Sequence, residues 1–227
     1  MKVGTDAVLL GAWADVQNVK TILDIGTGSG VIALMLAQRT NENVTIDAIE
    51  SAKGDSQQAY KNMLASPWYE KISVITVALQ EFHPKKKYDL IVCNPPFFTK
   101  SLLPPAKDRT NVRHDTQLTF DELIESAIEL LSAQGRLCVI LPPVEAEAFS
   151  AKAQAMNVYL SHQTRFFTRE GKPQERSLLQ FSLTSKVPKS DSLLLYQSGN
   201  QWSENYSKLT SDFYLDRVLP PEGKSIA

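Results

Sequence analysis

The stretch that decides the fold reads Leu23-Asp24-Ile25-Gly26-Thr27-Gly28-Ser29-Gly30. It overlaps the apolar run 21–25, which is typical of a short buried strand, and it precedes 31–39, whose residues favour a helix. Glycine has no side chain and tolerates positive φ, so the backbone of this turn can approach a ligand closely. Amide groups that open a helix can also receive a polar or anionic group. We therefore expect a strand, a glycine loop and a helix that bind a ligand together.

Strand-like and helix-like segments alternate along the rest of the chain. Further strands are predicted at 44–49, 72–77, 88–93 and 136–141, and further helices at 52–65, 120–131 and 145–156. A closing antiparallel pair is predicted at 158–167 and 177–183, followed by an amphipathic helix at 206–215. This order predicts a single α/β domain over residues 1–227, in which helices cover both faces of a mostly parallel sheet.

The predicted sheet also indicates where a ligand binds. In sheets of this kind, ligands bind outside the carboxyl ends of the strands, where the strand order reverses. Four places follow predicted strand ends, namely 24–30, Glu50, Ala78-Leu79 and 94–97. We expect them to meet at one edge of the sheet and to form the binding site.

Two acids near the glycine loop indicate which ligand it holds. Asp24 precedes the first glycine, and Glu50 lies at the end of the second strand, where an acid can accept hydrogen bonds from ribose hydroxyls. An acid at the mouth of the loop disfavours a pyrophosphate but favours a ligand with an ammonium group, such as the methionine moiety of S-adenosylmethionine. The loop therefore favours S-adenosylmethionine, and dinucleotide binding is the alternative.

A second motif, Asn94-Pro95-Pro96-Phe97, ends the predicted strand 88–93. Its prolines fix φ and hold the turn rigid. The side-chain oxygen of Asn94 and the carbonyl of Pro95 can accept hydrogen bonds from an exocyclic –NH₂ group and stabilise the positive charge that develops as its nitrogen attacks a methyl group. Phe97 offers a flat face on which a base can stack. Asn94, Pro95 and Phe97 are thus the expected catalytic residues, without a general base, because the nitrogen can lose its proton after methyl transfer.

The overall charge does not by itself indicate a nucleic-acid partner. The net charge is −1, with 24 basic and 25 acidic residues, so any basic surface must be local. Two stretches qualify: one holds Lys100, Lys107, Arg109, Arg113 and His114, and the other holds Arg165, Arg169, Lys172 and Arg176. Each stretch either contacts phosphates or is a solvated loop, and the sequence leaves both interpretations open.

Other sequence features concern metals and location. Cys93 and Cys138 each lie in an apolar, strand-like run without zinc spacing, so we expect buried thiols and no metal. The sequence contains no apolar run that approaches the ~20 residues of a membrane span, and its first residues lack a signal-peptide pattern. We expect a cytoplasmic monomer without a membrane partner.

The glycine loop and the Asn-Pro-Pro-Phe motif together resemble those of class I S-adenosylmethionine-dependent methyltransferases that act on amino nitrogens. Softer matches over nearly the whole chain resemble the bacterial tRNA1(Val) adenine-37 methyltransferase family. These matches are Lys2-Val3-Gly4-Thr5-Asp6, Leu9-Leu10-Gly11, Trp13, Leu36-Ala37-Gln38-Arg39, Ser66-Pro67-Trp68 and Phe213-Tyr214-Leu215. The resemblance implies a Rossmann-like fold with a mostly parallel seven-stranded sheet and a C-terminal antiparallel hairpin. It also implies methyl transfer to the exocyclic nitrogen of adenine in tRNA.

The resemblance also implies roles for individual residues. Asn94 and Phe97 would hold the target base, and Thr5 and Asp6 would close over the methionine end of the cofactor. The residues that would bind the cofactor are Asp24, Gly26, Gly28, Gly30, Glu50, Leu79 and Asn94.

Two departures from the family pattern matter. Many relatives carry an acid at the position of Ala78, where it contacts the adenine amino group of the cofactor. Ala78 cannot do this, so the backbone near Leu79 and Gln80 must replace it, or affinity drops. Family members also usually have residues upstream of the segment that begins here at Met1, so we expect an upstream segment to be missing.

Three other functions compete with tRNA adenine methylation. Methylation of a glutamine amide in a release factor suits the same planar geometry, but such enzymes usually carry a helical domain before the glycine loop. Methylation of guanine in ribosomal RNA usually involves a different end to the motif, and Phe98 argues against it. A cofactor-binding interaction module without catalysis would not need Asn94 and Phe97.

Overall fold

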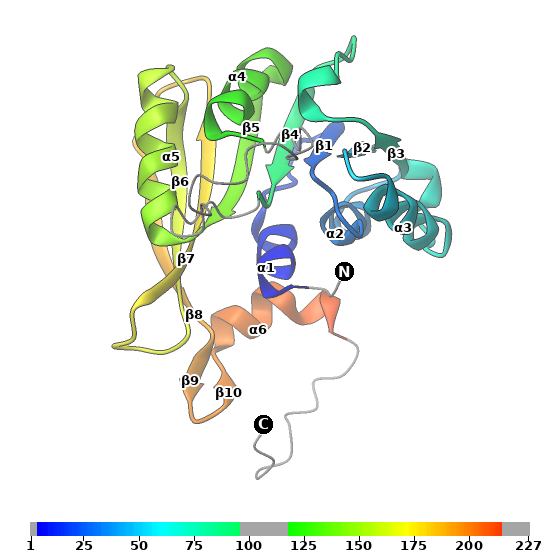
Figure 1. Cartoon of the computed structure of the whole chain (residues 1–227). Coiled ribbons are helices and arrows are strands. Elements are labelled where there is room, and N and C mark those ends of the chain that lie inside the picture. The colour runs from blue at the N-terminus through cyan, green and yellow to red at the C-terminus, as the bar shows by residue number, and fades with distance from the viewer. Residues whose placement is uncertain (1–3, 96–117, 215–227) are drawn as a thin grey trace, which may run out of the picture.

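The computed structural model describes residues 4–95 and 118–214 (Figure 1). The sheet contains the strands β1 (Thr21–Ile25), β2 (Thr45–Glu50), β3 (Ile72–Thr76), β4 (Tyr88–Cys93), β5 (Leu131–Leu141), β6 (Tyr159–Phe167), β7 (Gln174–Ser182) and β8 (Lys189–Leu194). A separate small hairpin is formed by β9 (Tyr196–Ser198) and β10 (Gln201–Trp202). The helices are α1 (Thr5–Trp13), α2 (Val31–Arg39), α3 (Lys53–Leu64), α4 (Phe120–Leu130), α5 (Pro143–Ala155) and α6 (Glu204–Thr210), with short 3₁₀ turns η1 (Tyr69–Lys71), η2 (Leu79–Glu81) and η4 (Ser211–Phe213).

The order of strands in the sheet is β3-β2-β1-β4-β5-β7-β6-β8. Strands β1 to β5 are parallel to one another, and β7 runs antiparallel between β5 and β6. The chain moves outward in one direction from β1 to β3 and in the other direction from β4 onward. The strand order therefore reverses between β1 and β4, which is where a ligand is expected to bind.

Helices cover both faces of the sheet (Figure 1). On one face, α4 and α5 bury a cluster that includes Leu123, Phe149 and Phe181. On the other face, α1, α2, α3 and α6 bury a cluster that includes Leu36 and Tyr206. The predicted class, a mostly parallel sheet with helices on both faces and antiparallel strands near the C-terminus, is confirmed.

Helix α1 is held closely against its neighbours. A Cβ atom added at Gly11 would lie 2.8 Å from the sulfur of Met35, so the missing side chain allows α1 and α2 to pack. Arg39, in the last turn of α2, donates to the carbonyl oxygens of Gly11 and Ala14 at 2.7 and 2.8 Å. These bonds satisfy carbonyl groups that the end of α1 leaves without helical partners.

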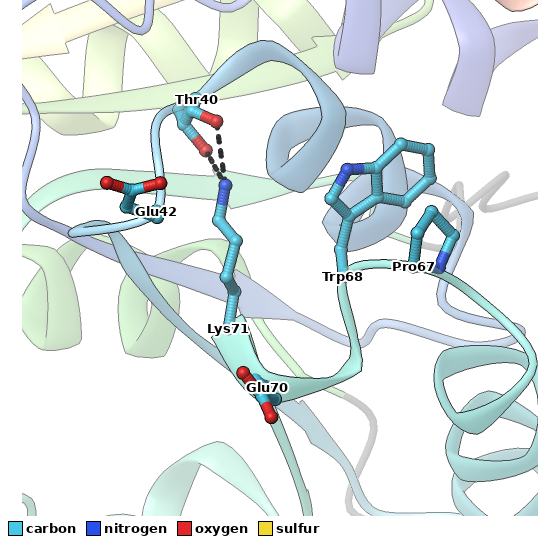
Figure 2. Close-up of a pocket in the computed structure, with 6 residues that line it drawn as sticks. All are labelled: Thr40, Glu42, Pro67, Trp68, Glu70 and Lys71. Atoms are coloured by element: carbon cyan, nitrogen blue, oxygen red, sulfur yellow. Dashed lines mark hydrogen bonds between the residues drawn. The ribbon is translucent and has the colours of Figure 1, made fainter.

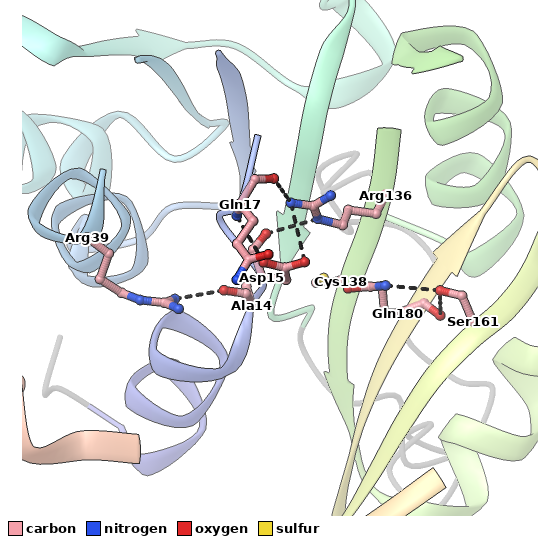
Figure 3. Close-up of polar contacts among 8 residues, drawn as sticks. All are labelled: Ala14, Asp15, Gln17, Arg39, Arg136, Cys138, Ser161 and Gln180. Carbon is pink, nitrogen blue, oxygen red and sulfur yellow. Dashed lines mark hydrogen bonds and ion pairs between the residues drawn. The ribbon is translucent and has the colours of Figure 1, made fainter. Parts of the chain in front are cut away.

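The segment after α1 is tied to β5 in the same way (Figure 3). The guanidinium group of Arg136 donates to the carbonyl oxygens of Asp15 and Gln17 and forms an ion pair with the carboxylate of Asp15. Nearby on the sheet, Gln180 links Ser161 to the buried thiol of Cys138 (Figure 3). Cys93 and Cys138 are both buried free thiols, as expected.

The structure adds elements that the sequence patterns did not predict. Helix α1 was not predicted, and β8 extends the described sheet to eight strands rather than seven. The helix predicted at 206–215 begins at Glu204 and continues as the 3₁₀ turn η4. The remaining predicted elements have the observed type, with ends that differ by a few residues.

Within 4–95 and 118–214, no helix is long and apolar enough to cross a bilayer. The same ranges hold no group of three or more histidine, cysteine, aspartate or glutamate side chains arranged to bind a metal ion.

Candidate active site

The strand register brings the predicted site residues to one edge of the sheet. Ile25 of β1 is paired with Ile49 of β2 and with Cys93 of β4. The next residues, Gly26, Glu50 and Asn94, therefore follow three adjacent strand ends at the same level. Glu50 is in turn paired with Thr76 of β3, which precedes Ala78 and Leu79. The described parts of the predicted segments, up to Pro95 in the last of them, therefore end at the same edge of the sheet.

The glycine loop has the backbone that its sequence predicts. Gly26, Gly28 and Gly30 have φ values of 66°, 55° and 85°, in the left-handed region that favours glycine. Gly26 is exposed, and a Cβ atom there would meet no described atom within 4 Å. The space beside Gly26 is therefore open on the described side, as a bound ligand requires.

Asp24 lies beneath this loop and is fully buried. Its Oδ2 atom accepts hydrogen bonds from Thr27 Oγ1 at 2.6 Å and from the backbone N–H of Ala33 at 3.2 Å. Its Oδ1 atom is buried without a hydrogen-bond partner in the described part of the chain. The carboxylate thus connects β1, the loop and α2, and one of its oxygens is left unsatisfied.

Burial raises the pKa of Asp24 to about 7. The bonds from Thr27 and Ala33 oppose this rise, and the nearby charge of Glu50 adds to it. The ionised carboxylate is disfavoured because its negative charge is removed from water, and no cation among the described residues balances it. A ligand that brings a positive charge to this loop would supply that balance.

Glu50 connects the end of β2 to the loop. Its Oε2 atom accepts from the backbone N–H of Gly28 at 3.0 Å, and its Oε1 atom accepts from the backbone N–H of Ala52 at 2.9 Å. Each carboxylate oxygen has two lone pairs, so both oxygens can still accept from ligand hydroxyls. Glu50 is half-buried, which leaves part of the side chain accessible.

The Asn-Pro motif begins where β4 ends. Asn94 is half-buried and Pro95 is buried, directly after the last residue of β4. Pro96 and Phe97 lie outside the described residues. The stacking of a base on Phe97 therefore stays a prediction from the sequence. The described part of the motif lies beside the glycine loop, because Cys93 is paired with Ile25.

Thr5 and Asp6 form the first turn of α1. Thr5 is exposed, whereas Asp6 is half-buried and its Oδ2 atom accepts from Nε of Arg176 at 2.8 Å. The segment at Ala78 follows the end of β3, and the side chain of Leu79 is buried in the core under α4 and α5. Any contact of Leu79 with a ligand would therefore come from its backbone.

The second basic stretch divides into two kinds of residue. Arg165 and Lys172 are exposed. Arg169 contacts the β9–β10 turn at Gly199 and Asn200 and lies over the ring of Tyr196, and Arg176 pairs with Asp6. The first stretch, from Lys100 to His114, lies outside the described residues.

A depression of ≈ 410 Å³ lies elsewhere in the structure (Figure 2). It is lined by Thr40, Glu42, Pro67, Trp68, Glu70 and Lys71. Lys71 precedes β3, so this depression is at the amino edge of the sheet, opposite the site. The amine of Lys71 donates to the carbonyls of Ala37 and Thr40 and so caps the C-terminal end of α2. Lys71 therefore has a structural role.

The fold and this edge define a class of protein. A mostly parallel sheet with a glycine loop after β1, an acid at the end of β2 and an Asn-Pro turn after β4 is the arrangement expected of an S-adenosylmethionine-dependent methyltransferase. Residues 3–165 match the family model described as the methyltransferase small domain.

Similarity to known sequences identifies the family. The chain is 42% identical over 217 residues to a tRNA1(Val) (adenine(37)-N6)-methyltransferase of Klebsiella pneumoniae, covering 95% of this chain and 89% of the relative. It is 43% identical over 221 residues to the Phocaeicola vulgatus enzyme of the same name, covering 95% of this chain and 92% of that one. The chain belongs to the tRNA1(Val) (adenine(37)-N6)-methyltransferase family.

A solved structure supports the fold alone. A predicted O-methyltransferase from Agrobacterium tumefaciens superposes with a TM-score of 0.69 at 18% identity, covering 91% of this chain and 96% of that chain.

Two residues of the described site escaped the sequence analysis. Thr27 was not singled out, although its hydroxyl in the middle of the glycine loop bonds to Asp24. Arg176 was noted only as part of a basic stretch, and its pairing with Asp6 spans 170 positions. The loop position of Thr27 was a usable signal, whereas a contact at such separation has no local signature.

Proposed function

We propose that this protein transfers the methyl group of S-adenosylmethionine to the exocyclic nitrogen of adenine 37 in tRNA1(Val). The observation that carries the proposal is the alignment of Gly26, Glu50 and Asn94 at three adjacent strand ends. In this proposal, Asn94 accepts from the substrate amino group beside the loop that holds the cofactor. The names of relatives that match 95% of the chain support the choice of tRNA and of position 37.

The described residues fit the cofactor. Gly26 leaves room for it, and Glu50 has lone pairs for its ribose hydroxyls. The unsatisfied, buried oxygen of Asp24 fits a nearby positive charge, which the ammonium group of the methionine moiety provides. In this proposal Asp24 acts from beneath the loop, by holding its shape and by its charge, rather than at its open mouth.

The proposed mechanism of methyl transfer depends on two hydrogen-bond acceptors at the end of β4. When bound, S-adenosylmethionine supplies an electrophilic methyl group on a positively charged sulfur. Asn94 and the carbonyl of Pro95 would accept hydrogen bonds from the adenine amino group and orient its lone pair. As the nitrogen becomes positive, these acceptors stabilise it, and much of the remaining acceleration comes from positioning. The proton leaves to water after transfer.

The target adenine must leave its stack to reach this edge, as base-modifying enzymes generally require. We further propose that the chain acts as a single-domain monomer in the cytoplasm. Exposed Arg165 and Lys172 are candidates for phosphate contacts.

Methylation in vitro tests the proposal. The purified protein is incubated with labelled S-adenosylmethionine and a tRNA1(Val) transcript, and nucleosides are analysed by mass spectrometry. We expect N6-methyladenosine in this transcript and none in a matched transcript with guanine at position 37. Methylation of a release-factor peptide or of guanine in ribosomal RNA, with an unmodified tRNA, would contradict it.

A further inference from the structure

The ion pair between Asp6 and Arg176 joins two distant parts of the chain. Nε of Arg176, on β7, donates to Oδ2 of Asp6 in the first turn of α1, at 2.8 Å and across 170 positions. Their side chains are only 27% and 19% exposed, respectively. Limited exposure reduces the screening of this pair by water and salt.

This pair lies at the same edge of the sheet as the candidate active site. Ser177 of β7 is paired with Leu141, the last residue of β5, so Arg176 lies one position beyond the carboxyl end of β5. Cys93, before Asn94, is paired with Val139 of the same strand. Arg176 therefore continues the row of strand ends that includes Gly26, Glu50 and Asn94.

The rest of α1 is already fixed by other contacts. Arg39 binds the carbonyls of Gly11 and Ala14 at its far end, and Gly11 packs against Met35. Neither contact involves the first turn. The pair with Arg176 is thus a tie between that turn and the antiparallel half of the sheet.

We propose that Arg176 is a positioning residue for cofactor binding, which acts through Asp6. Arg176 holds Oδ2 of Asp6 and fixes the first turn of α1 at the mouth of the cofactor site. No hydrogen bond within the described ranges engages Oδ1 of Asp6, so that oxygen can face the methionine end of S-adenosylmethionine. This inference rests on the proposed function of the site.

Calorimetry and kinetics on Arg176→Ala, Asp6→Ala and the double variant test this role. We expect each single variant to raise both the Kd and the KM for S-adenosylmethionine by roughly two- to tenfold, with kcat at saturating cofactor and the KM for tRNA nearly unchanged. The double variant should be no worse than Asp6→Ala, because Arg176 acts through that residue. Arg176→Lys should restore part of the affinity, since the amine can still pair with the carboxylate.

Lys186→Ala is the control, because Lys186 is an exposed basic residue between β7 and β8. It should leave the Kd for S-adenosylmethionine unchanged, and circular dichroism should confirm that all variants are folded. If Arg176→Ala does not fold, the Kd and KM for S-adenosylmethionine are compared instead among the parent, Arg176→Lys and Arg176→Gln.

The proposal would be overturned if the increases in Kd caused by the two single substitutions multiply in the double variant. It would also be overturned if the substitutions raise the KM for tRNA but not the Kd for S-adenosylmethionine. If the parent binds S-adenosylmethionine and Arg176→Ala binds it with the same Kd, the proposal is also overturned. A parent protein that fails to bind S-adenosylmethionine would instead contradict the proposed function.

Discussion

The carboxylate of Glu50 and the backbone N–H of Gly28 form a hydrogen bond of 3.0 Å, which connects the end of β2 to the glycine loop. The other oxygen of Glu50 accepts from Ala52 N at 2.9 Å and fixes the orientation of the carboxylate. The loop is therefore held in shape by the side chain that is expected to bind ribose. A preorganised site of this kind loses less conformational freedom when a ligand binds.

Glu50→Gln should weaken cofactor binding. The amide retains one oxygen, so the substituted side chain cannot accept from both Gly28 and Ala52, and it lacks the negative charge. A hydrogen bond to a charged group contributes about 1.5–3 kcal/mol, so the Kd for S-adenosylmethionine should rise by roughly tenfold or more. Calorimetry measures this change. Glu42→Gln, at the depression on the opposite edge, should bind like the parent, and equal affinities for all three proteins would remove Glu50 from the site.

Asp24 should make the free energy of unfolding depend on pH. Its pKa is about 7 in the folded protein and near 3.8 when unfolded. Between these values the folded state keeps a proton that the unfolded state has lost, so stability falls as pH rises from about 4 to about 7. The slope is at most about 1.4 kcal/mol per pH unit. Urea unfolding across this range should show a contribution of this sign in the parent that is missing in Asp24→Asn.

The same group should couple proton release to cofactor binding. A bound cation favours the ionised carboxylate, so binding near pH 6 should release protons that Asp24→Asn does not release. Calorimetry in two buffers with different ionisation enthalpies counts these protons. Identical counts for the parent and the variant would show that Asp24 stays neutral in the complex.

Asn94→Ala should reduce turnover far more than binding. The lost acceptor acts on a charge that develops during methyl transfer, and loss of one such group commonly costs ~2.7–4 kcal/mol, or roughly a hundred- to a thousandfold in rate. Single-turnover methylation of a tRNA transcript measures this rate. The Kd for S-adenosylmethionine should stay close to that of the parent, because the glycine loop and Glu50 are unchanged.

Phe97→Ala provides a contrast from the same motif. Loss of stacking should raise the KM for tRNA, by an amount that corresponds to ~1–3 kcal/mol, and Phe97→Tyr should remain active. An Asn94→Ala protein with the parent's single-turnover rate would rule out the proposed mechanism.

Arg39→Met should destabilise the protein. The guanidinium group donates to the carbonyls of Gly11 and Ala14, and burial lowers the pKa of Arg39. Methionine fills similar space but leaves two acceptors without their donor, which should cost roughly 1–3 kcal/mol in the free energy of unfolding. Thermal or urea unfolding measures this loss. Arg165→Met, at an exposed position, should change stability little, and equal losses would indicate that the contacts of Arg39 contribute nothing specific.

The central strands and the first part of the site could be predicted from sequence because their signals are local. The run 21–25 and the glycine loop lie side by side in the chain, and the parallel register then aligns Glu50 and Asn94 with them. A rule about strand ends was sufficient to bring these residues together. The pairing of Arg176 with Asp6 depends instead on how the two halves of the sheet meet, which no short pattern records.

Helix α1 and strand β8 were missed for different physical reasons. Residues Val8 to Ala12 are all buried, because α1 packs against α2, β5 and α6, so the helix lacks the polar face that reveals an amphipathic pattern. Strand β8 is an edge strand with the largely polar sequence Lys189-Ser190-Asp191-Ser192-Leu193-Leu194, and it is stabilised by pairing with β6. Tertiary packing, rather than local preference, determines both elements.

The position of β7 between β5 and β6 has a consequence for synthesis on the ribosome. Strand β6 is made before β7, yet in the finished sheet it is separated from β5 by β7. A nascent chain that has emerged as far as β6 therefore exposes the unpaired edge of β5, and such edges are sites of aggregation. The edge of β5 is covered only when β7 has emerged and pairs with it. The β6–β7 hairpin therefore protects the newly made chain from aggregation as well as extending the sheet.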